Sequence, residues 1–114
     1  MNILNQYNLV FRNVSVFGTI QPNCDGNSAL ANFLDTTIYQ DTLQEGIQRC
    51  NGYLNNQINP DGVNSINGEV YIAIFDTSSV EIYSHFGDQN QILQTIPLND
   101  FKIIVEMWYN FIYQ

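Results

Sequence analysis

The chain has 114 residues, with eleven acidic and three basic side chains and a formal net charge of −8 at pH 7. This length predicts a single domain, residues 1–114, and a hydrophobic content of 45% is sufficient for a core. A strongly negative domain repels nucleic acid and anionic membranes, so we expect neither as a direct partner and favour a basic protein. The alternative is that the charge serves solubility alone.

The N-terminal segment does not resemble a secretory signal, because it lacks a basic start followed by an uninterrupted apolar run. No stretch reaches the ~18 apolar residues of a membrane-spanning helix. Cys24 and Cys50 are too few for a disulfide framework. We therefore expect a cytoplasmic protein with two free thiols, and a single bridge between them is the alternative.

The first third of the chain predicts a strand, a turn and a short helix. Residues 7–20 are rich in Val, Phe and Ile, which favours a strand that is bent or doubled near residues 12–13. Residues 21–28 contain Pro, Asp-Gly and Asn, which are typical of a turn. Ser28 is then a suitable N-cap for a short helix through Leu34.

Residues 41–58 predict a second helix. Asp41 is expected at the N-cap, with Gln44 three residues later as in a capping box. Apolar side chains recur at steps of four, three, four and four, the spacing of one helical face: Leu43, Ile47, Cys50, Leu54 and Ile58.

Two runs of β-branched and aromatic residues follow, on either side of residues 76–79, and predict a β-hairpin. Residues 92–97 predict a third strand. Side chains alternate along a strand, and the residues expected to face the helices are Val70, Ile72, Ile74, Val80 and Ile82. Those expected on the opposite face are Tyr71, Phe75, Tyr83 and His85.

The C-terminal segment predicts a core helix. Asn99 is expected at its N-cap, and Asp100 in its first turn favours the helix dipole. Its apolar residues form one broad stripe: Ile103, Ile104, Met107, Trp108, Phe111 and Ile112. The expected order is therefore β–α–β–β–β–α, an α+β fold with an antiparallel sheet and helices packed on one face.

No motif for catalysis or for a bound cofactor stands out. His85 is the sole histidine, and two cysteines with one histidine fall short of a structural zinc site. Residues 57–69 partly match a calcium loop, but Glu69 falls one position late. No phosphate-binding glycine motif occurs. We expect no enzyme activity, no metal and no cofactor.

A surface for a protein partner is the most suggestive feature. Aromatic side chains bordered by acids are typical of such contacts. The candidate contact residues are Glu69, Tyr71, Asp76, Glu81, Tyr83, His85 and Asp88, with Asp41 and Glu45 as a second candidate patch. The alternative is that another element covers this face.

The C-terminal pattern is similar to that of many bacterial immunity proteins of polymorphic-toxin systems, including contact-dependent inhibition. It consists of a strand, Ile96-Pro97-Leu98, Asp100-Phe101, and a helix with Trp108 and Phe111. The resemblance covers the last ~45 residues and transfers no binding residue. It implies a protein that neutralises a cognate toxin domain, and the charge favours a basic nuclease with a masked active-site cleft. The alternative is a small-ligand-binding or structural module, with a homodimer as one form.

Overall fold

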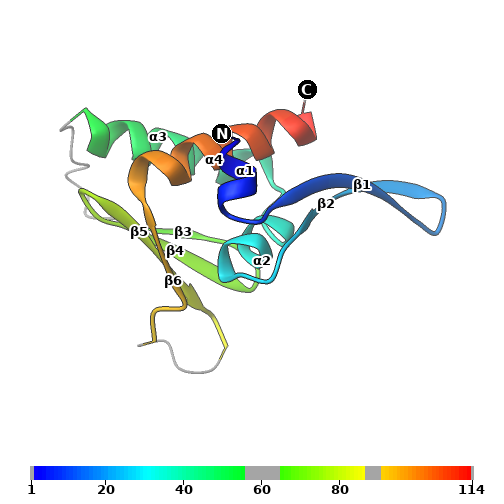
Figure 1. Cartoon of the computed structure of the whole chain (residues 1–114), viewed down its shortest axis with the longest axis horizontal. Helices are drawn as coiled ribbons and strands as arrows, with labels where there is room; N and C mark the ends of the chain where they lie inside the picture. Colours follow the sequence, from blue (N-terminus) through cyan, green and yellow to red (C-terminus); the bar gives the residue numbers. More distant parts are fainter. Residues whose placement is uncertain (1, 56–64, 87–90, 114) are drawn as a thin grey trace.

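The computed structural model describes residues 2–55, 65–86 and 91–113 (Figure 1). It confirms the α+β class and adds a division into two sheets. The elements in chain order are α1 (Ile3–Gln6), β1 (Val10–Val16), β2 (Thr19–Asp25), α2 (Ala29–Asp35), α3 (Gln40–Leu54), β3 (Ser65–Asn67), β4 (Tyr71–Phe75), β5 (Ser79–Ser84), β6 (Gln94–Pro97) and α4 (Leu98–Tyr113). The expected order therefore lacked α1, β2 and β3, and it had one helix in place of α2 and α3.

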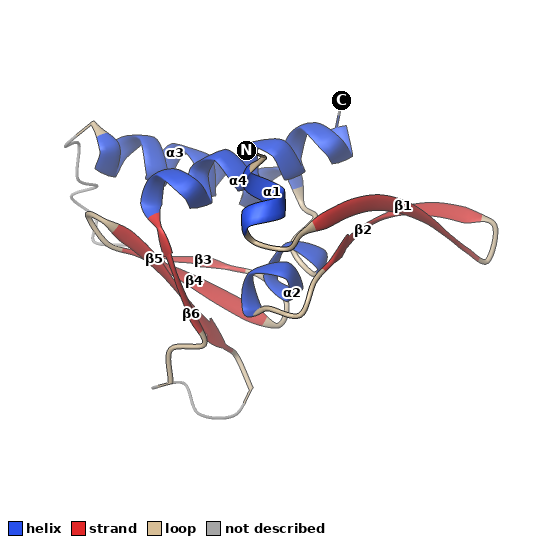
Figure 2. Cartoon of the chain, viewed as in Figure 1, coloured by secondary structure: helices blue, strands red, loops and turns tan. Residues whose placement is uncertain are grey.

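The larger sheet is an antiparallel meander in the order β3-β4-β5-β6. One of its faces carries Phe75, Val80 and Ile96, which lie side by side in the register and are buried. Phe101 of α4 packs edge-on against Phe75, with ring centroids 5.6 Å apart, and also contacts Phe33 of α2. The helices therefore share a single core with this face, as expected (Figure 2).

The faces of β4 are the reverse of the prediction. Ala73 and Phe75 are buried against the helices, whereas Ile74 is 36% exposed on the outer face. Tyr71 also packs against the core. The physical reason is that Tyr71–Phe75 is apolar at every position, so alternation cannot select a face. For β5 the prediction is right, because Val80 and Ile82 alternate with polar residues and are buried.

Helices α3 and α4 pack against each other above the sheet, and the boundaries of both differ from the prediction. The N-cap of α3 is Tyr39 rather than Asp41, and no side chain caps it. Helix α4 begins at Leu98, so Asn99 lies in its first turn and is not the cap. Leu54 is exposed, although the apolar spacing placed it in the core, and Ile58 lies outside the described residues.

Strands β1 and β2 form a separate two-stranded hairpin, which projects from the body as an arm (Figure 1). Its two-residue turn is Phe17-Gly18, with φ values of 52° and 80°. The turn expected over residues 21–28 is wrong for Gln21–Asp25, which belong to β2. The short helix after it is confirmed, because the amide of Ala31 donates to Ser28 Oγ over 3.1 Å at the N-terminus of α2.

Within the described residues, the helices are too short or too polar to cross a membrane.

Candidate functional site

Two of the predicted contact residues share the outer face of the sheet. Tyr83 and Glu81 lie on β5, and the Tyr83 hydroxyl donates to the Glu81 carboxylate over 3.3 Å. Ile72 pairs with Tyr83 and Ile74 pairs with Glu81, so both isoleucines belong to the same face. We name these four residues the outer sheet face. It combines aliphatic, aromatic and acidic side chains on the side of the sheet opposite the helices.

The remaining predicted residues near the sheet are dispersed. Asp76 is exposed just after β4, and Glu69 is exposed just before it. Tyr71 faces the helices, so it does not join the outer sheet face. His85 is half-buried, and its Nε2 lies 3.0 Å from the carbonyl oxygen of Gly68, so it connects the end of β5 to the β3–β4 turn. Asp88 lies outside the described residues.

The second predicted patch, on α3, is connected to the sheet through Tyr39. The Tyr39 hydroxyl donates to the Glu69 carboxylate over 2.9 Å, which brings the β3–β4 turn beside the start of α3. Asp41 follows two residues later and is exposed. Glu45 is different because Arg49 forms an ion pair with it at 2.7 Å. Asp41 and Glu69 therefore lie at one acidic edge, and Glu45 is largely neutralised.

The three basic side chains of the chain are each paired with a carboxylate: Arg12 with Asp25, Arg49 with Glu45, and Lys102 with Glu106. Two further carboxylates have internal roles. Asp35 accepts hydrogen bonds from Asn23 and Cys24, and Asp100 accepts one from Tyr7 over 2.6 Å. Asp35 and Asp100 have no cation partner, and neither do the other four described carboxylates, Asp41, Glu69, Asp76 and Glu81. All four belong to the predicted contact set.

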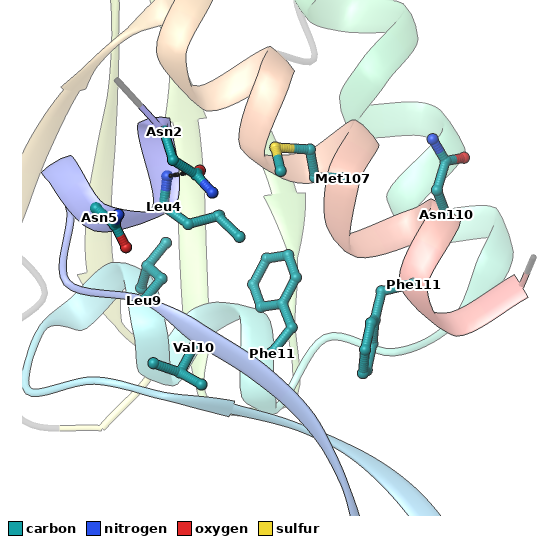
Figure 3. Close-up of a pocket in the computed structure, with 9 residues that line it drawn as sticks. All are labelled: Asn2, Leu4, Asn5, Leu9, Val10, Phe11, Met107, Asn110 and Phe111. Atoms are coloured by element: carbon teal, nitrogen blue, oxygen red, sulfur yellow. Dashed lines mark hydrogen bonds between the residues drawn. The ribbon is translucent and has the colours of Figure 1, made fainter.

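Sequence reasoning missed a cavity of about 670 Å³ between α1, β1 and α4 (Figure 3). Its floor is aromatic, since Phe11 contacts Trp108 and Phe111 with ring centroids 4.9 and 5.7 Å apart. None of its lining residues is charged: Asn2, Leu4, Asn5, Leu9, Val10, Phe11, Met107, Asn110 and Phe111. They come from opposite ends of the chain, so no local pattern indicated the cavity.

Sequence reasoning also missed the exposed apolar residues of the arm. The side chain of Phe17 is fully exposed at the tip, and Ile20 and Val10 are 71% and 56% exposed. No local pattern indicated this exposure, because a run rich in Val, Phe and Ile is ordinarily a strand within a core.

Both cysteines are free and buried. Burial raises the pKa of the Cys24 thiol to about 12, and the nearby Asp35 and Asp25 raise it further. Burial likewise raises the pKa of Cys50 to about 12, partly offset by Lys102. A protonated, buried thiol is a poor nucleophile. Among the described residues, no three His, Cys, Asp or Glu side chains come together in a way that suits a metal ion.

Comparisons of this chain with protein-family models, curated proteins and solved structures found no match.

Proposed function

We propose that the protein is an immunity protein that binds and neutralises a cognate toxin domain by covering a basic active-site cleft, most simply that of a nuclease. The observation that supports this most is that four carboxylates of the predicted contact set, Asp41, Glu69, Asp76 and Glu81, have no cation partner, in a chain of net charge −8. Such a field attracts a basic partner and accelerates the encounter.

The outer sheet face is the part of this surface best suited to close contact. Ile72 and Ile74 supply apolar area beside the aromatic ring of Tyr83, and interface centres are enriched in such side chains. Desolvation and the adjacent Glu81 raise the pKa of Tyr83, and its hydroxyl donates a hydrogen bond to the Glu81 carboxylate. A standard interface needs about 800 Å² per partner, so the turns beside this face would also contribute to the contact.

The proposal expects a toxin gene with a basic C-terminal domain beside the gene of this protein, and the test is binding to that domain, measured by co-purification and then by calorimetry. Glu81→Lys should weaken the complex by about tenfold or more, because it places a cation against a basic cleft. Glu106→Lys makes the same charge change on α4, away from the outer sheet face, and should weaken it by less than about threefold. Raising ionic strength should weaken wild-type binding. Equal effects of the two variants, or an affinity that does not change with ionic strength, would contradict the proposal.

The exposed apolar residues of the arm and the apolar cavity favour a second candidate, a structural module that forms a homodimer. Sedimentation of the isolated protein at low and high concentration distinguishes it from a protein that associates solely with a toxin.

A further inference from the structure

The arm lacks the support that a two-stranded sheet needs. In the part of the chain that the structure describes, β1 and β2 pair with each other and with no further strand. An isolated hairpin of this kind is marginally stable in water. The outer edge of β1 presents unpaired backbone groups, and exposed edges are sites of strand addition. On the outer edge of β2, the amide of Cys24 already donates to the Asp35 carboxylate over 2.9 Å. With Val10 and Ile20 also exposed, the arm has the properties of an uncovered interface.

The tip of the arm carries an unexpected residue. Positive φ at both Phe17 and Gly18 defines a type I′ turn, whose first position favours Asn, Asp or Gly. A bulky side chain in that conformation is disfavoured. Phe17 is therefore not favoured by the turn. Its ring is fully exposed, so it does not pack in the protein's own core. An exposed aromatic ring at the end of an arm is suited to insertion into a partner.

The base of the same arm offers an apolar site of matching chemistry. The cavity there is walled by Leu4, Leu9, Phe11, Met107 and Phe111, whose side chains surround its opening in Figure 3. Aromatic rings and methionine sulfur both pack favourably with a further aromatic ring. Each chain thus exposes an apolar side chain, Phe17, at the tip of the arm and an apolar cavity at its base.

Backbone geometry selects the edge through which two arms can pair. The tight turn makes Val16–Thr19 a hydrogen-bonded pair, and such pairs alternate with non-hydrogen-bonded ones along an antiparallel ladder. Asn13–Pro22 is then a non-hydrogen-bonded pair, in which the backbone nitrogens point outward. Proline has no N–H, so the outer edge of β2 lacks a donor at its centre. The outer edge of β1 keeps its donors at Phe11, Asn13 and Ser15.

We propose that two copies of this chain associate through antiparallel pairing of their β1 edges about a two-fold axis at Asn13. When Val10–Val16 overlaps fully with the same strand of the second copy, Val10 of one copy lies opposite Val16 of the other, and Asn13 is at the centre. Asn13 then pairs with Asn13, and Phe11 with Ser15, which are the residues with outward donors. The next position places Phe17 of each copy opposite Leu9 of the other, at the wall of its cavity.

Charge and area are consistent with this contact. The charged side chains of the arm, Arg12 and Asp25, form an ion pair with each other, and the cavity lining is uncharged. The contact is therefore close to neutral in a chain of net charge −8. A buried Phe contributes ~150–250 Å², roughly a quarter of the ~800 Å² per partner of a stable interface. The paired strands and the flanking Val10 and Val16 supply the rest.

Cysteine cross-linking tests the register. Asn13→Cys places two cysteines in a directly opposed pair, whose Cα atoms lie ~5.5 Å apart and within disulfide range. Ser15→Cys is the control on the same strand, also exposed, but its copies lie ~13 Å apart along the paired strands. Under mild oxidation Asn13→Cys should form the disulfide-linked dimer and Ser15→Cys should not. The buried native thiols should contribute little. Equal cross-linking of both variants would contradict the register.

Phe17→Asn tests the contribution of the Phe17 ring to the dimer separately from its effect on folding. Asn-Gly is a preferred type I′ turn, so the monomer should be at least as stable, whereas the dissociation constant of the dimer should rise at least tenfold in sedimentation experiments. Salt should strengthen the dimer, because it screens repulsion between two acidic chains, whereas it should weaken the proposed toxin complex. The two proposals can therefore fail independently. A wild-type protein that stays monomeric at high concentration and high salt would overturn the dimer.

Discussion

The indole Nε1 of Trp108 donates a hydrogen bond to the backbone carbonyl of Thr37 over 3.0 Å, and both residues are buried. The bond joins α4 to the segment between α2 and α3, and these two parts of the chain are far apart in the sequence. Phe11 of the arm packs on the same indole, with ring centroids 4.9 Å apart. Trp108 therefore connects α4, to which it belongs, with the segment between α2 and α3 and with the base of the arm.

Replacing Trp108 should destabilise the fold substantially. Trp108→Phe removes the donor to Thr37, which costs ~1–3 kcal/mol for a buried carbonyl, and leaves unfilled volume beside Phe11. We expect the free energy of unfolding to fall by about 3 kcal/mol, measured by urea denaturation followed by circular dichroism. Ile103→Ala is the control on the same helix, at a side chain 37% exposed, and should cost about 1 kcal/mol or less. Similar losses for both variants would refute the anchoring role of Trp108.

The stability of the protein should decline at alkaline pH. Burial raises the pKa of Cys24 and of Cys50 from 9.0 to about 12, and burial with the hydrogen bond to Asp100 raises that of Tyr7 from 10.0 to about 12. In each case folding favours the protonated form. The stabilisation is complete below the unfolded pKa and is lost as pH rises from about 9 towards 12, by ~1.4 kcal/mol per pH unit for each titrating group.

Urea unfolding over a pH series from about 8 to about 11 measures this slope. Cys50→Ala removes one thiol from the titration, so its stability should fall less steeply than that of the wild type above pH 9, whatever its stability at neutral pH. A slope unchanged by the substitution would show that the Cys50 thiol does not ionise on unfolding in this range.

Elements could be predicted from the sequence where apolar and polar positions are clearly distinct, or where a residue has the side chain of a helix cap. The predicted stripe of α4 is right for Ile104 and Trp108, which are buried, and wrong for Ile103, which is 37% exposed. Phe101 and Val105 lie outside the predicted stripe and are buried. Ser28 has the side chain and position of an N-cap, and it caps α2. In contrast, Tyr71–Phe75 has no polar position, so its face is decided by the pairing of β4 with β5 and was predicted wrongly.

The arm could not be predicted, because its local signals are misleading. Phe17 is not a turn residue, yet it occupies a type I′ turn with Gly18. Pro22 and Asp25 indicate a turn, yet they lie within β2, at an edge where proline is tolerated. For the candidate site, composition directed attention to the acidic residues, and their role as partner contacts stays a prediction. The cavity was not predicted, because it forms only when α1 and α4 meet.

Pro22 should limit assembly to the dimer. Its ring removes the central donor from the outer edge of β2, so one edge of the arm remains available for pairing. Pro22→Thr restores that donor with a residue that favours strands. Both edges of the arm would then pair, and a contact that does not close generates open-ended assemblies. We expect species larger than a dimer at high concentration, measured by sedimentation velocity and light scattering.

Asn13→Pro is the matched control for this prediction. It removes the outward donor at the centre of β1 and leaves the hairpin ladder intact, because Asn13–Pro22 is already a non-hydrogen-bonded pair. This variant should be monomeric with an unchanged circular dichroism spectrum. If Pro22→Thr remained dimeric, the β2 edge would be blocked by something other than its proline. If Asn13→Pro still dimerised, the copies would associate through a surface other than β1.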